Sequence, residues 1–286
     1  GNVVAFFFVQ MADPQFGMFA FFSTLTDEEV EERWRRRLFV RKAPEIITGF
    51  ADESRLYTLA IEASNRLKPA FVAMCGDMVN DPKDQDQLDE LFRITAMLQD
   101  DIPIHWVSGN HDVGDAPTTE SLALYRERFG PDNFSFDHDG CHFAVINSSV
   151  CYNPENVPDE WESIVQFLKD DLSTARANGC EDIILFTHHP LFLERADEGD
   201  GYFVIPRDRR KVILDILHEH DVSSVFAGHW HRNNYAEDGK LQMVVTGAVG
   251  YPLGDDPSGL RVVKVRGDGV THKYYAMDDL PDSIAL

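Results

Sequence analysis

Short apolar runs alternate with amphipathic segments through most of the chain. The first run, NVVAFFFVQ at 2–10, is continuously apolar and too short for a core helix, which predicts a buried strand. Comparable runs predict strands at 70–75, 104–107, 134–136, 142–148, 182–187 and 222–227. The segments between them have helical periodicity and predict helices at 52–67, 84–100, 118–129, 159–178 and 208–219.

The last part of the chain has a different pattern. LQMVVTG, LRVVKVR and VTHKYYAM are three strand-like segments with glycine-rich turns and no helix between them. Strand–helix alternation followed by strands alone predicts a layered α/β fold in which two β-sheets pack face to face. Because we find no repeats and no linker-like segment, we expect a single domain over residues 1–286.

An aromatic-rich insertion at about 16–50 follows the first strand. Within it, TDEEVEERWRRRL begins with a capping box formed by Thr26 and Glu29, which favours a helix. Glutamate precedes arginine by four residues in three pairs: Glu29–Arg33, Glu31–Arg35 and Glu32–Arg36. Such pairing favours a solvated helix face over a basic run that contacts substrate. The phenylalanines nearer the first strand form either a lid over a site or an ordinary aromatic core cluster.

The composition restricts the expected partners and compartment. The 286 residues carry 26 basic against 49 acidic side chains, a formal net charge of −23, so we expect neither non-specific nucleic-acid binding nor membrane association. A Cys141–Cys151 disulfide is disfavoured, because one extended strand between them would span roughly 33 Å. The sequence contains no CxxC pair, no signal peptide and no long apolar span. We expect free thiols and a cytoplasmic protein, with a removed N-terminal targeting segment as the alternative.

Polar side chains follow five of the predicted strands. The motifs are ADPQFG after 2–10, GDMVN after 70–75, GNHD after 104–107, HHP after 182–187 and GHWH after 222–227. Open α/β sheets hold their ligands at the carboxyl ends of their strands, so we expect these groups to share one site. A single such residue is more often a hydrogen-bonded turn residue, but five of them favour a functional site.

The types of side chain indicate the chemistry of that site. The candidate metal ligands are Asp13, Gln15, Asp77, Asn110, His188, His229 and His231. Carboxylate and amide oxygens with imidazole nitrogens, and no thiolate, suit manganese, iron or zinc. These donors are too many for one four-coordinate ion and are enough for two ions that share a carboxylate. Two such ions stabilise the attacking and leaving oxygens of a phosphoryl displacement.

In this order and spacing, the five motifs resemble those of the calcineurin-like metallophosphoesterase superfamily over about residues 10–231. Longer stretches, including SGNHDVGDAPT, HPLFLE and GHWHRN, are similar nearly end to end to a narrower family. That family comprises the calcineurin-like phosphoesterase domain-containing proteins, also described as complete serine/threonine-protein phosphatases. The resemblance implies a four-layer αββα sandwich of two mixed β-sheets flanked by helices. It also implies a hydrolase of phosphate esters with two metal ions, which would be Mn, Fe or Zn.

The resemblance also implies a role for each residue of the site. One metal would be held by Asp13, Gln15, Asp77 and His231, and the other by Asp77, Asn110, His188 and His229. His111 would donate a proton to the leaving oxygen, and Asp112 would orient and polarise its ring. The implied reaction is direct in-line attack on phosphorus by a hydroxide that bridges the two ions, without a phosphoenzyme.

At two positions of these motifs the role of the side chain is less direct. The superfamily's H-x-P motif selects His188 as a ligand and leaves His189 to support it or to face the substrate. Most of the superfamily has histidine where this chain has Gln15, although the narrower family shares the glutamine. An amide oxygen is a weaker donor than imidazole. We therefore predict either looser metal binding on that side or a Gln15 that binds substrate or water instead.

Substrate specificity is the least predictable property of the sequence. The candidates for substrate contacts lie close to the ligand motifs and are Phe16, Asn80, His189, Arg232 and Tyr251. The expected substrates are phosphomonoesters, as small molecules or phosphoproteins. The alternatives are a phosphodiesterase on small or nucleotide diesters and a non-catalytic protein-binding scaffold. The near-complete ligand set together with His111 argues against the scaffold.

Overall fold

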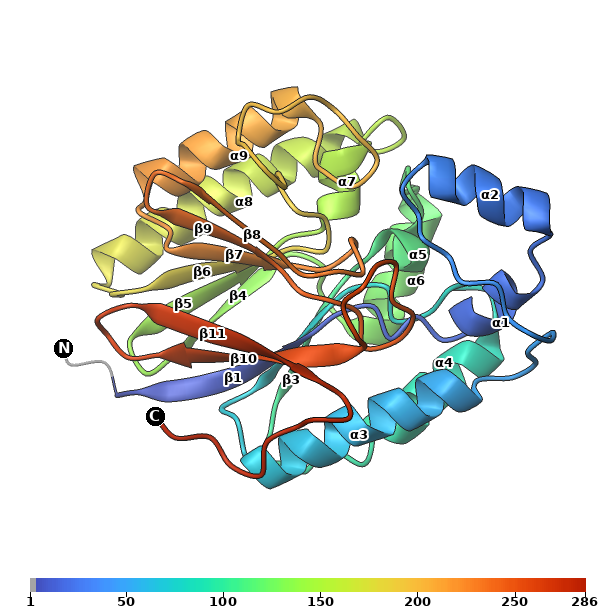
Figure 1. Ribbon diagram of the computed structural model, residues 1–286. Helices are drawn as coiled ribbons and strands as arrows, with labels where there is room; N and C mark the ends of the chain where they lie inside the picture. Colours follow the sequence, from blue (N-terminus) through green and yellow to red (C-terminus); the bar gives the residue numbers. More distant parts are fainter. Residues whose placement is uncertain (1–3) are drawn as a thin grey trace.

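The computed structural model describes residues 4–286 and contains two mixed β-sheets that pack face to face with helices on their outer sides (Figure 1). The strand order is β11-β10-β1-β2-β3 in one sheet and β4-β5-β6-β7-β9-β8 in the other. The strands are β1 (Phe6–Met11), β2 (Val72–Cys75), β3 (Ile104–Val107), β4 (Phe134–His138), β5 (Cys141–Val145), β6 (Ile183–Phe186), β7 (Ser224–Ala227), β8 (Asn234–Asp238), β9 (Leu241–Val245), β10 (Gly259–Val265) and β11 (Val270–Ala276). The predicted αββα sandwich of two mixed sheets is confirmed.

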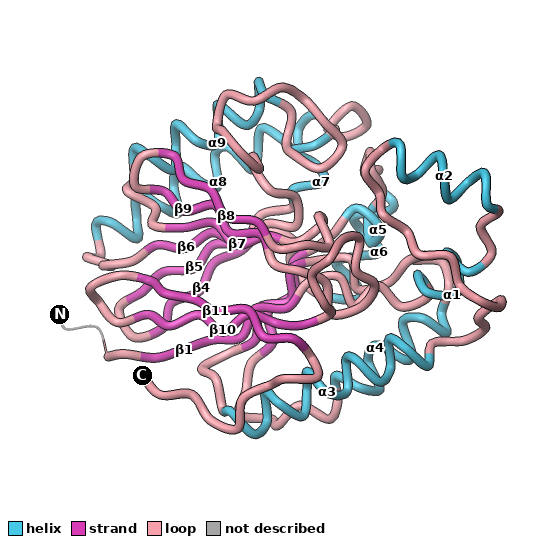
Figure 2. The backbone as a smooth tube through the Cα atoms, viewed as in Figure 1, coloured by secondary structure: helices cyan, strands magenta, loops and turns pink. Residues whose placement is uncertain are grey.

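The sheet topology brings the expected strand ends to one side of the molecule. In the five-stranded sheet, β1, β2 and β3 are parallel, and β10 runs antiparallel to β1. In the six-stranded sheet, β5, β6, β7 and β9 are parallel, with β4 and β8 as antiparallel edges. The loops that leave the carboxyl ends of the parallel strands gather beside the sandwich (Figure 2). This arrangement gives one edge at which groups from both sheets meet.

Helices cover the outer faces of both sheets. The pair α3 (Ala51–Leu67) and α4 (Gln85–Thr95) packs on the five-stranded sheet, and α8 (Pro158–Ala177) and α9 (Arg207–Glu219) pack on the other (Figure 1). The remaining helices are α1 (Met18–Ser23), α2 (Asp27–Arg35), α5 (Asn110–Val113), α6 (Thr119–Phe129) and α7 (Ser148–Tyr152). Over residues 4–286, every helix is too short or too polar to cross a membrane.

A layer of phenylalanines joins the two sheets. Phe8 stacks on Phe71 of its own sheet with ring centroids 4.8 Å apart. It also meets Phe143 and Phe186 of the opposite sheet edge to face, at 5.6 and 5.5 Å. All of these rings are buried, and burial of each contributes roughly 1.5–3 kcal/mol before losses of conformational entropy are counted. This aromatic layer fixes the spacing of the sheets and hence the loops that leave them.

Several predicted elements differ from the structure. The predicted strand at 142–148 ends at Val145 and is followed by α7, and residues 2 and 3 of the first predicted strand lie outside the described residues. The three C-terminal strands do not stay together: β9 pairs with β7, whereas β10 pairs with β1 of the other sheet. Our predictions omitted β8 because this edge strand is polar and only partly buried. The four cysteines are free, as expected.

Candidate metal centre

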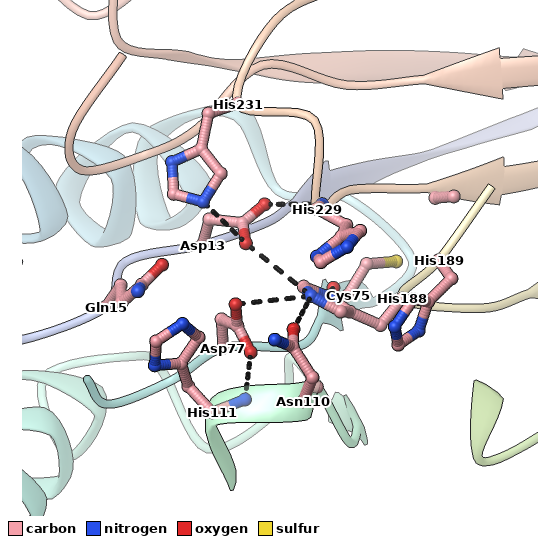
Figure 3. A network of polar contacts seen from close by, with 12 residues as sticks. Asp13, Gln15, Cys75, Asp77, Asn110, His111, His188, His189, His229 and His231 are labelled. Carbon is pink, nitrogen blue, oxygen red and sulfur yellow. Dashed lines mark hydrogen bonds and ion pairs between the residues drawn. The ribbon is translucent and has the colours of Figure 1, made fainter. Parts of the chain in front are cut away.

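The seven candidate ligands converge at the carboxyl edge, although they come from five strands of two sheets (Figure 3). Each is at most 3% exposed to solvent. Three backbone contacts close the edge: Asp13 N–H donates to Gly76 O at 3.0 Å, Gln15 N–H donates to Asp77 O at 2.9 Å, and His229 N–H donates to the Asp13 carboxylate at 3.0 Å. The loops of the two sheets therefore meet and bring their polar side chains into one buried cluster.

Two potential ligand groups overlap at Asp77. One consists of Asp77, His188 and His229, and the other of Asp13, Asp77 and His231; within each, the donor atoms lie within 4.8 Å of one another. His188 Nε2 is 3.2 Å from Asp77 Oδ2, and His231 Nε2 is 3.2 Å from Asp13 Oδ1. The central position of Asp77 is the geometry that one carboxylate shared between two cations requires.

Backbone carbonyls orient the three histidines of this cluster. His188 Nδ1 and His231 Nδ1 donate to the carbonyls of Cys75 and Tyr251, each at 2.7 Å, and His229 Nε2 donates to Tyr202 O at 3.3 Å. In each ring the second nitrogen then faces the other side chains of the cluster. Metal-binding histidines in proteins are held in the same way.

The amide side chains are anchored so that their oxygens face the cluster. Gln15 Nε2 donates to Asn80 Oδ1 at 3.1 Å, and Asn110 Nδ2 donates to Asp115 Oδ1 at 3.0 Å. Asn110 Oδ1 lies 3.1 Å from His188 Nε2. The nitrogen of each amide is therefore occupied, and its oxygen faces the cluster: that of Gln15 has no partner, and that of Asn110 is paired with His188.

Two buried oxygen atoms in the cluster have no hydrogen-bond partner, namely Asp13 Oδ1 and Gln15 Oε1. Although His231 Nε2 lies 3.2 Å from Asp13 Oδ1, these atoms form no hydrogen bond. Leaving a buried acceptor unsatisfied costs about 1–3 kcal/mol, and a bound cation would satisfy both atoms. The residues therefore fit metal ions, and Gln15 is oriented as a ligand would be.

The backbone of the site has an uncommon conformation. Over residues 4–286, nine residues other than glycine have positive φ, and five of these are candidate ligands: Asp13, Gln15, Asp77, His229 and His231. The left-handed region costs such residues about 1–3 kcal/mol each, and such strain clusters at functional sites. Close packing adds a further constraint, because a β-carbon at Gly109 would collide with the Asp77 carboxylate. The backbone is therefore locally strained in the conformation that places these side chains together.

The charges of the cluster are strongly coupled. Burial by itself would raise the pKa of Asp77, but the positive charges of His188 and His111 outweigh it and lower the pKa. Burial by itself would lower the pKa of His188, but Asp77 and Asp13 raise it to about 10. Burial lowers the pKa of His229, and the charge of His188 adds to this effect. The buried carboxylates therefore stabilise positive charge at the centre of the cluster, whereas burial keeps His229 neutral.

His111 and Asp112 do not interact in the predicted way. His111 Nδ1 donates to the carbonyl of Asn80 at 2.9 Å, which leaves Nε2 as the nitrogen without a partner. The Asp112 carboxylate instead accepts backbone N–H groups of Gly109 and Asp77 at 2.8 Å and of Met78 at 3.1 Å. The expectation that Asp112 orients the His111 ring is therefore wrong. Asp112 fixes the two ligand loops to each other, and the Asn80 carbonyl orients His111.

The proposed substrate contacts divide into two groups. Asn80 and His189 border the cluster, where Asn80 holds Gln15 and the His189 ring lies 4.4 Å from that of His229. His189 is 1% exposed and shares a hydrogen bond with Ser148 Oγ at 2.8 Å, so it supports the cluster rather than facing solvent. The side chains of the other three are held away from the cluster, although the backbone carbonyl of Tyr251 accepts from His231.

Burial, stacking and hydrogen bonds hold the side chains of Phe16, Tyr251 and Arg232 in these positions. Phe16 is fully buried against Phe50 and Tyr57. The Tyr251 hydroxyl is held by the backbone of Arg41, and Arg232 stacks on Trp230 at 3.5 Å. Closeness in sequence to a ligand motif therefore did not predict which side chains face the site.

The insertion contributes to the mouth of the site, but with other residues than expected. The capping box is confirmed: Glu29 N–H donates to Thr26 Oγ1, and Thr26 N–H donates to Glu29 Oε2 at 2.8 Å. Of the three predicted glutamate–arginine pairs, only Glu31–Arg35 forms, at 3.9 Å, and Glu29 bonds to the Thr26 backbone instead of Arg33. A cavity of about 80 Å³ beside the ligands is lined in part by Phe22, Arg33, Tyr202 and Phe203. The loop that carries Tyr202 contains no motif that could have identified it.

The αββα sandwich and two ligand groups that share one carboxylate define the class of the dimetal phosphoesterases. The family model of the calcineurin-like phosphoesterases matches residues 47–233, so the chain belongs to that family. This match includes Asp77, Asn110, His188, His229 and His231 and begins after Asp13 and Gln15. The predicted family and the prediction of a phosphoric ester hydrolase are confirmed.

The chain is similar to curated proteins over nearly its whole length. It is 37% identical over 284 residues to the serine/threonine-protein phosphatase CPPED1 of Homo sapiens, which covers 97% of this chain and 85% of that protein. The CPPED1 phosphatase of Danio rerio is 32% identical over 283 residues, with 97% and 86% covered. The similarity extends over the insertion as well as over the ligand motifs.

Solved structures share the fold at low sequence identity. A purple acid phosphatase from yellow lupin seeds superposes with a TM-score of 0.67 at 13% identity, covering 98% of this chain and 53% of that one. A dimetal phosphatase from Danio rerio gives 0.62 at 14% identity, covering 96% and 100%. These likenesses concern the architecture of the sandwich.

Proposed function

We propose that this protein hydrolyses phosphomonoesters, including phosphorylated proteins, in a site that holds two metal ions. The observation that carries the proposal is the pair of buried ligand groups with Asp77 in common. Orphaned oxygens on Asp13 and Gln15 support it, because they are buried acceptors that lack a partner. The names of the CPPED1 relatives, which are serine/threonine-protein phosphatases, favour a phosphoprotein.

Each half of the cluster would hold one ion. Asp13, Gln15, Asp77 and His231 would bind the first, and Asp77, Asn110, His188 and His229 the second. The absence of a thiolate from this set favours Mn, Fe or Zn over a thiolate-bound structural metal. Bound there, the ions would lower the pKa of a water molecule and offset the charge of the phosphoryl group for in-line displacement.

His111 is the residue that we propose as the proton donor. Its Nδ1 is held by the Asn80 carbonyl, and its ring lines the cavity beside the ligands. The remaining nitrogen, Nε2, can therefore carry a proton to the leaving oxygen of the ester. Asp112 acts indirectly, because it holds the backbone of Asp77 and Gly109 in place. Loss of Asp112 would displace both Asp77 and His111.

A phosphodiesterase is the second candidate function. A protein of Rhodococcus erythropolis named as a probable cyclic nucleotide phosphodiesterase is 25% identical over 219 residues. The same ligand types serve either reaction, so the ligand set alone does not distinguish them. The phosphomonoesterase proposal has stronger support from relatives that match 97% of the chain.

The test compares p-nitrophenyl phosphate with bis-p-nitrophenyl phosphate after loading with manganese. We expect turnover of the monoester to exceed that of the diester, and replacement of Asp77 by Asn to abolish both. Faster turnover of the diester would favour the phosphodiesterase. Failure to turn over either ester while two equivalents of metal are bound would instead support a protein-binding scaffold.

We also infer a reducing, cytoplasmic compartment. Cys75, Cys141 and Cys151 are buried free thiols, and Cys180 is a free, partly buried one. Burial raises the pKa of Cys75 to about 12, so this thiol stays protonated and unreactive beside the metal ligands. Mass spectrometry of the protein from cells, alkylated under denaturing conditions, should find all four cysteines reduced.

A further inference from the structure

Helix α2 of the insertion presents an arginine to the mouth of the metal centre. Arg33 lines the same cavity of about 80 Å³ as Asp77, His111 and His229. Among the residues that line this cavity in the described part of the chain, Arg33 is the only lysine or arginine. A guanidinium group therefore faces the space that a phosphoryl group would enter.

Arg33 has no carboxylate partner among residues 4–286. The glutamate four residues earlier, Glu29, closes the capping box at Thr26 and does not pair with Arg33. The guanidinium carbon instead lies 5.2 Å from the ring centroid of Phe22 and 6.0 Å from that of Phe21. Cation–π contacts at this range fix the position of a guanidinium and leave its N–H groups free to donate.

The neighbouring Arg35 has a different, solvent-exposed environment. Its guanidinium lies 3.9 Å from the carboxylate of Glu31, and its side chain is 75% exposed. Arg35 has the position that the sequence pattern predicts for a solvated helix face. Arg33, two residues earlier and on the other side of the same helix, is partly buried and lines the cavity that the metal ligands also line.

We propose that Arg33 binds the terminal oxygens of the substrate's phosphoryl group and thereby selects phosphomonoesters over diesters. This proposal rests on the function proposed above. A guanidinium donates two parallel N–H groups to two oxygens of one phosphate, which gives both affinity and orientation. A phosphomonoester has three terminal oxygens and a charge of about −1.5 to −2 at neutral pH. A diester has fewer terminal oxygens and less charge, so it gains less from the same arginine.

The charge of the rest of the chain gives a further reason for this arginine. The protein carries a formal net charge of −23, which repels a phosphate dianion as it approaches. Arg33 begins the run RWRRRLFVRK at 33–42, which contains six basic residues and no acidic one. Acidic residues at 27–32 and Glu45 balance this run over the insertion as a whole, so the positive charge at the cavity comes from the placement of Arg33 itself.

The experiment compares Arg33→Gln and Arg33→Lys with the matched control Arg35→Gln in manganese-loaded protein. Calorimetric titration with inorganic phosphate measures binding without turnover, and metal analysis checks that the ions are retained. We expect Arg33→Gln to weaken phosphate binding about 10- to 100-fold. Arg33→Lys should recover part of the lost affinity, because it restores the positive charge without the paired N–H groups of a guanidinium. Arg35→Gln should leave binding unchanged.

Kinetics with the two p-nitrophenyl esters then test the substrate class. For Arg33→Gln we expect kcat/KM for the monoester to fall about as much as phosphate binding, and kcat/KM for the diester to fall less than about threefold. Equal losses for the two esters, or unchanged phosphate binding, would overturn the role of Arg33 even if wild-type turnover supports a phosphatase. If wild-type protein turns over neither ester but binds phosphate through Arg33, the proposed function fails and the binding site stands.

Discussion

Two clusters of histidine and carboxylate groups lie at opposite ends of the six-stranded sheet. At the carboxyl end of β6, His188 meets Asp77 and Asp13. At the amino end of β5, His142 lies between Asp137 and Asp171, and Asp137, His142 and Cys180 offer donor atoms within 4.8 Å of one another. By residue types and spacing alone, both clusters are candidate metal sites.

Hydrogen bonding separates the two clusters. Both ring nitrogens of His142 already bond to carboxylates, at 2.5 Å to Asp137 and 2.7 Å to Asp171. The second oxygen of Asp171 accepts from Ser135 Oγ at 2.5 Å. The His142 cluster is therefore satisfied without an ion, whereas the metal centre retains buried oxygens without partners. Unsatisfied acceptors also occur elsewhere, at Glu53 and Gln242 for example, so they indicate a cation site only where they lie among other candidate ligands.

Backbone conformation separates them as well. Five of the candidate ligands at the metal centre have positive φ, whereas Asp137, His142, Asp171 and Cys180 do not. Strain of this kind persists only where the surrounding structure enforces it. The comparison suggests that the strand-end loops are shaped for a ligand, and that the His142 cluster forms within ordinary strand and helix geometry.

Loss of the shared carboxylate of Asp77 should have the largest effect and tests the difference between the two clusters. Replacement of Asp77 by Asn should remove both ions and lower activity by about a thousandfold or more, because several kcal/mol of electrostatic stabilisation are lost. Asp137→Asn is the matched control in the other cluster and should keep both metal content and activity. Metal analysis and ester hydrolysis measure these effects. Full metal content in Asp77→Asn would contradict the shared-ligand assignment.

Removal of His111 should have the next largest effect. His111→Ala should retain both ions and slow alkyl phosphates by about 10²- to 10⁴-fold, because their poor leaving groups need a proton donor. p-Nitrophenyl phosphate has a good leaving group and should lose much less. Rates for a series of leaving groups measure this dependence. An unchanged rate on an alkyl phosphate would exclude His111 as the acid.

Gln15 tests whether an orphaned oxygen marks a ligand. Gln15→His should bind manganese more tightly by about tenfold, equivalent to ~1.4 kcal/mol, because imidazole is the stronger donor. Gln15→Met has a similar shape without the amide oxygen and should bind one ion more weakly than wild type. Metal titration followed by calorimetry measures both variants. Three identical affinities would show that Gln15 does not ligate, and the orphaned oxygen would need another explanation.

The parts of the fold and site that could be predicted depend on residues within one strand or directly after it. Continuous apolar runs predicted most strands because parallel strands are buried on both faces. The ligands were predictable because each directly follows a strand, so sheet topology alone brings them together. The same rule says nothing about Asp112, whose partners are backbone N–H groups of the 77–79 loop. Its role depends on the exact path of that loop.

The residues at the mouth of the site could not be predicted, because their positions depend on the tertiary path of loops. Arg33 fits the pattern of a solvated helix pair, but Glu29 bonds to the Thr26 backbone and Arg33 packs against Phe21 and Phe22. Tyr202 belongs to a long segment between β6 and α9 with no local motif. Phe16 shows the converse error, since it is adjacent to a ligand but points into the core.

The smallest expected effect concerns the stability that the His142 cluster provides. Burial would lower the pKa of His142, but its hydrogen bonds with Asp171 and Asp137 and their charges outweigh burial and raise it. A raised folded-state pKa means that the folded protein binds the proton more tightly than the unfolded chain does. The contribution of His142 to the free energy of unfolding is therefore fully present below the unfolded pKa of about 6.5. It is lost as pH rises through the folded-state pKa. Because Asp137 is largely exposed, solvent screening limits the contribution to about 1 kcal/mol.

The measurement is the free energy of unfolding of wild type and His142→Gln in urea between about pH 5.5 and 9. We expect the two proteins to differ most at the acidic end and to converge at the alkaline end, with equal metal content throughout. A constant difference would mean that His142 contributes by packing and neutral hydrogen bonds. If zinc raised the stability of wild type but not that of His142→Gln, the cluster would be a metal site. Hydrogen-bond satisfaction would then not distinguish a structural cluster from a metal site.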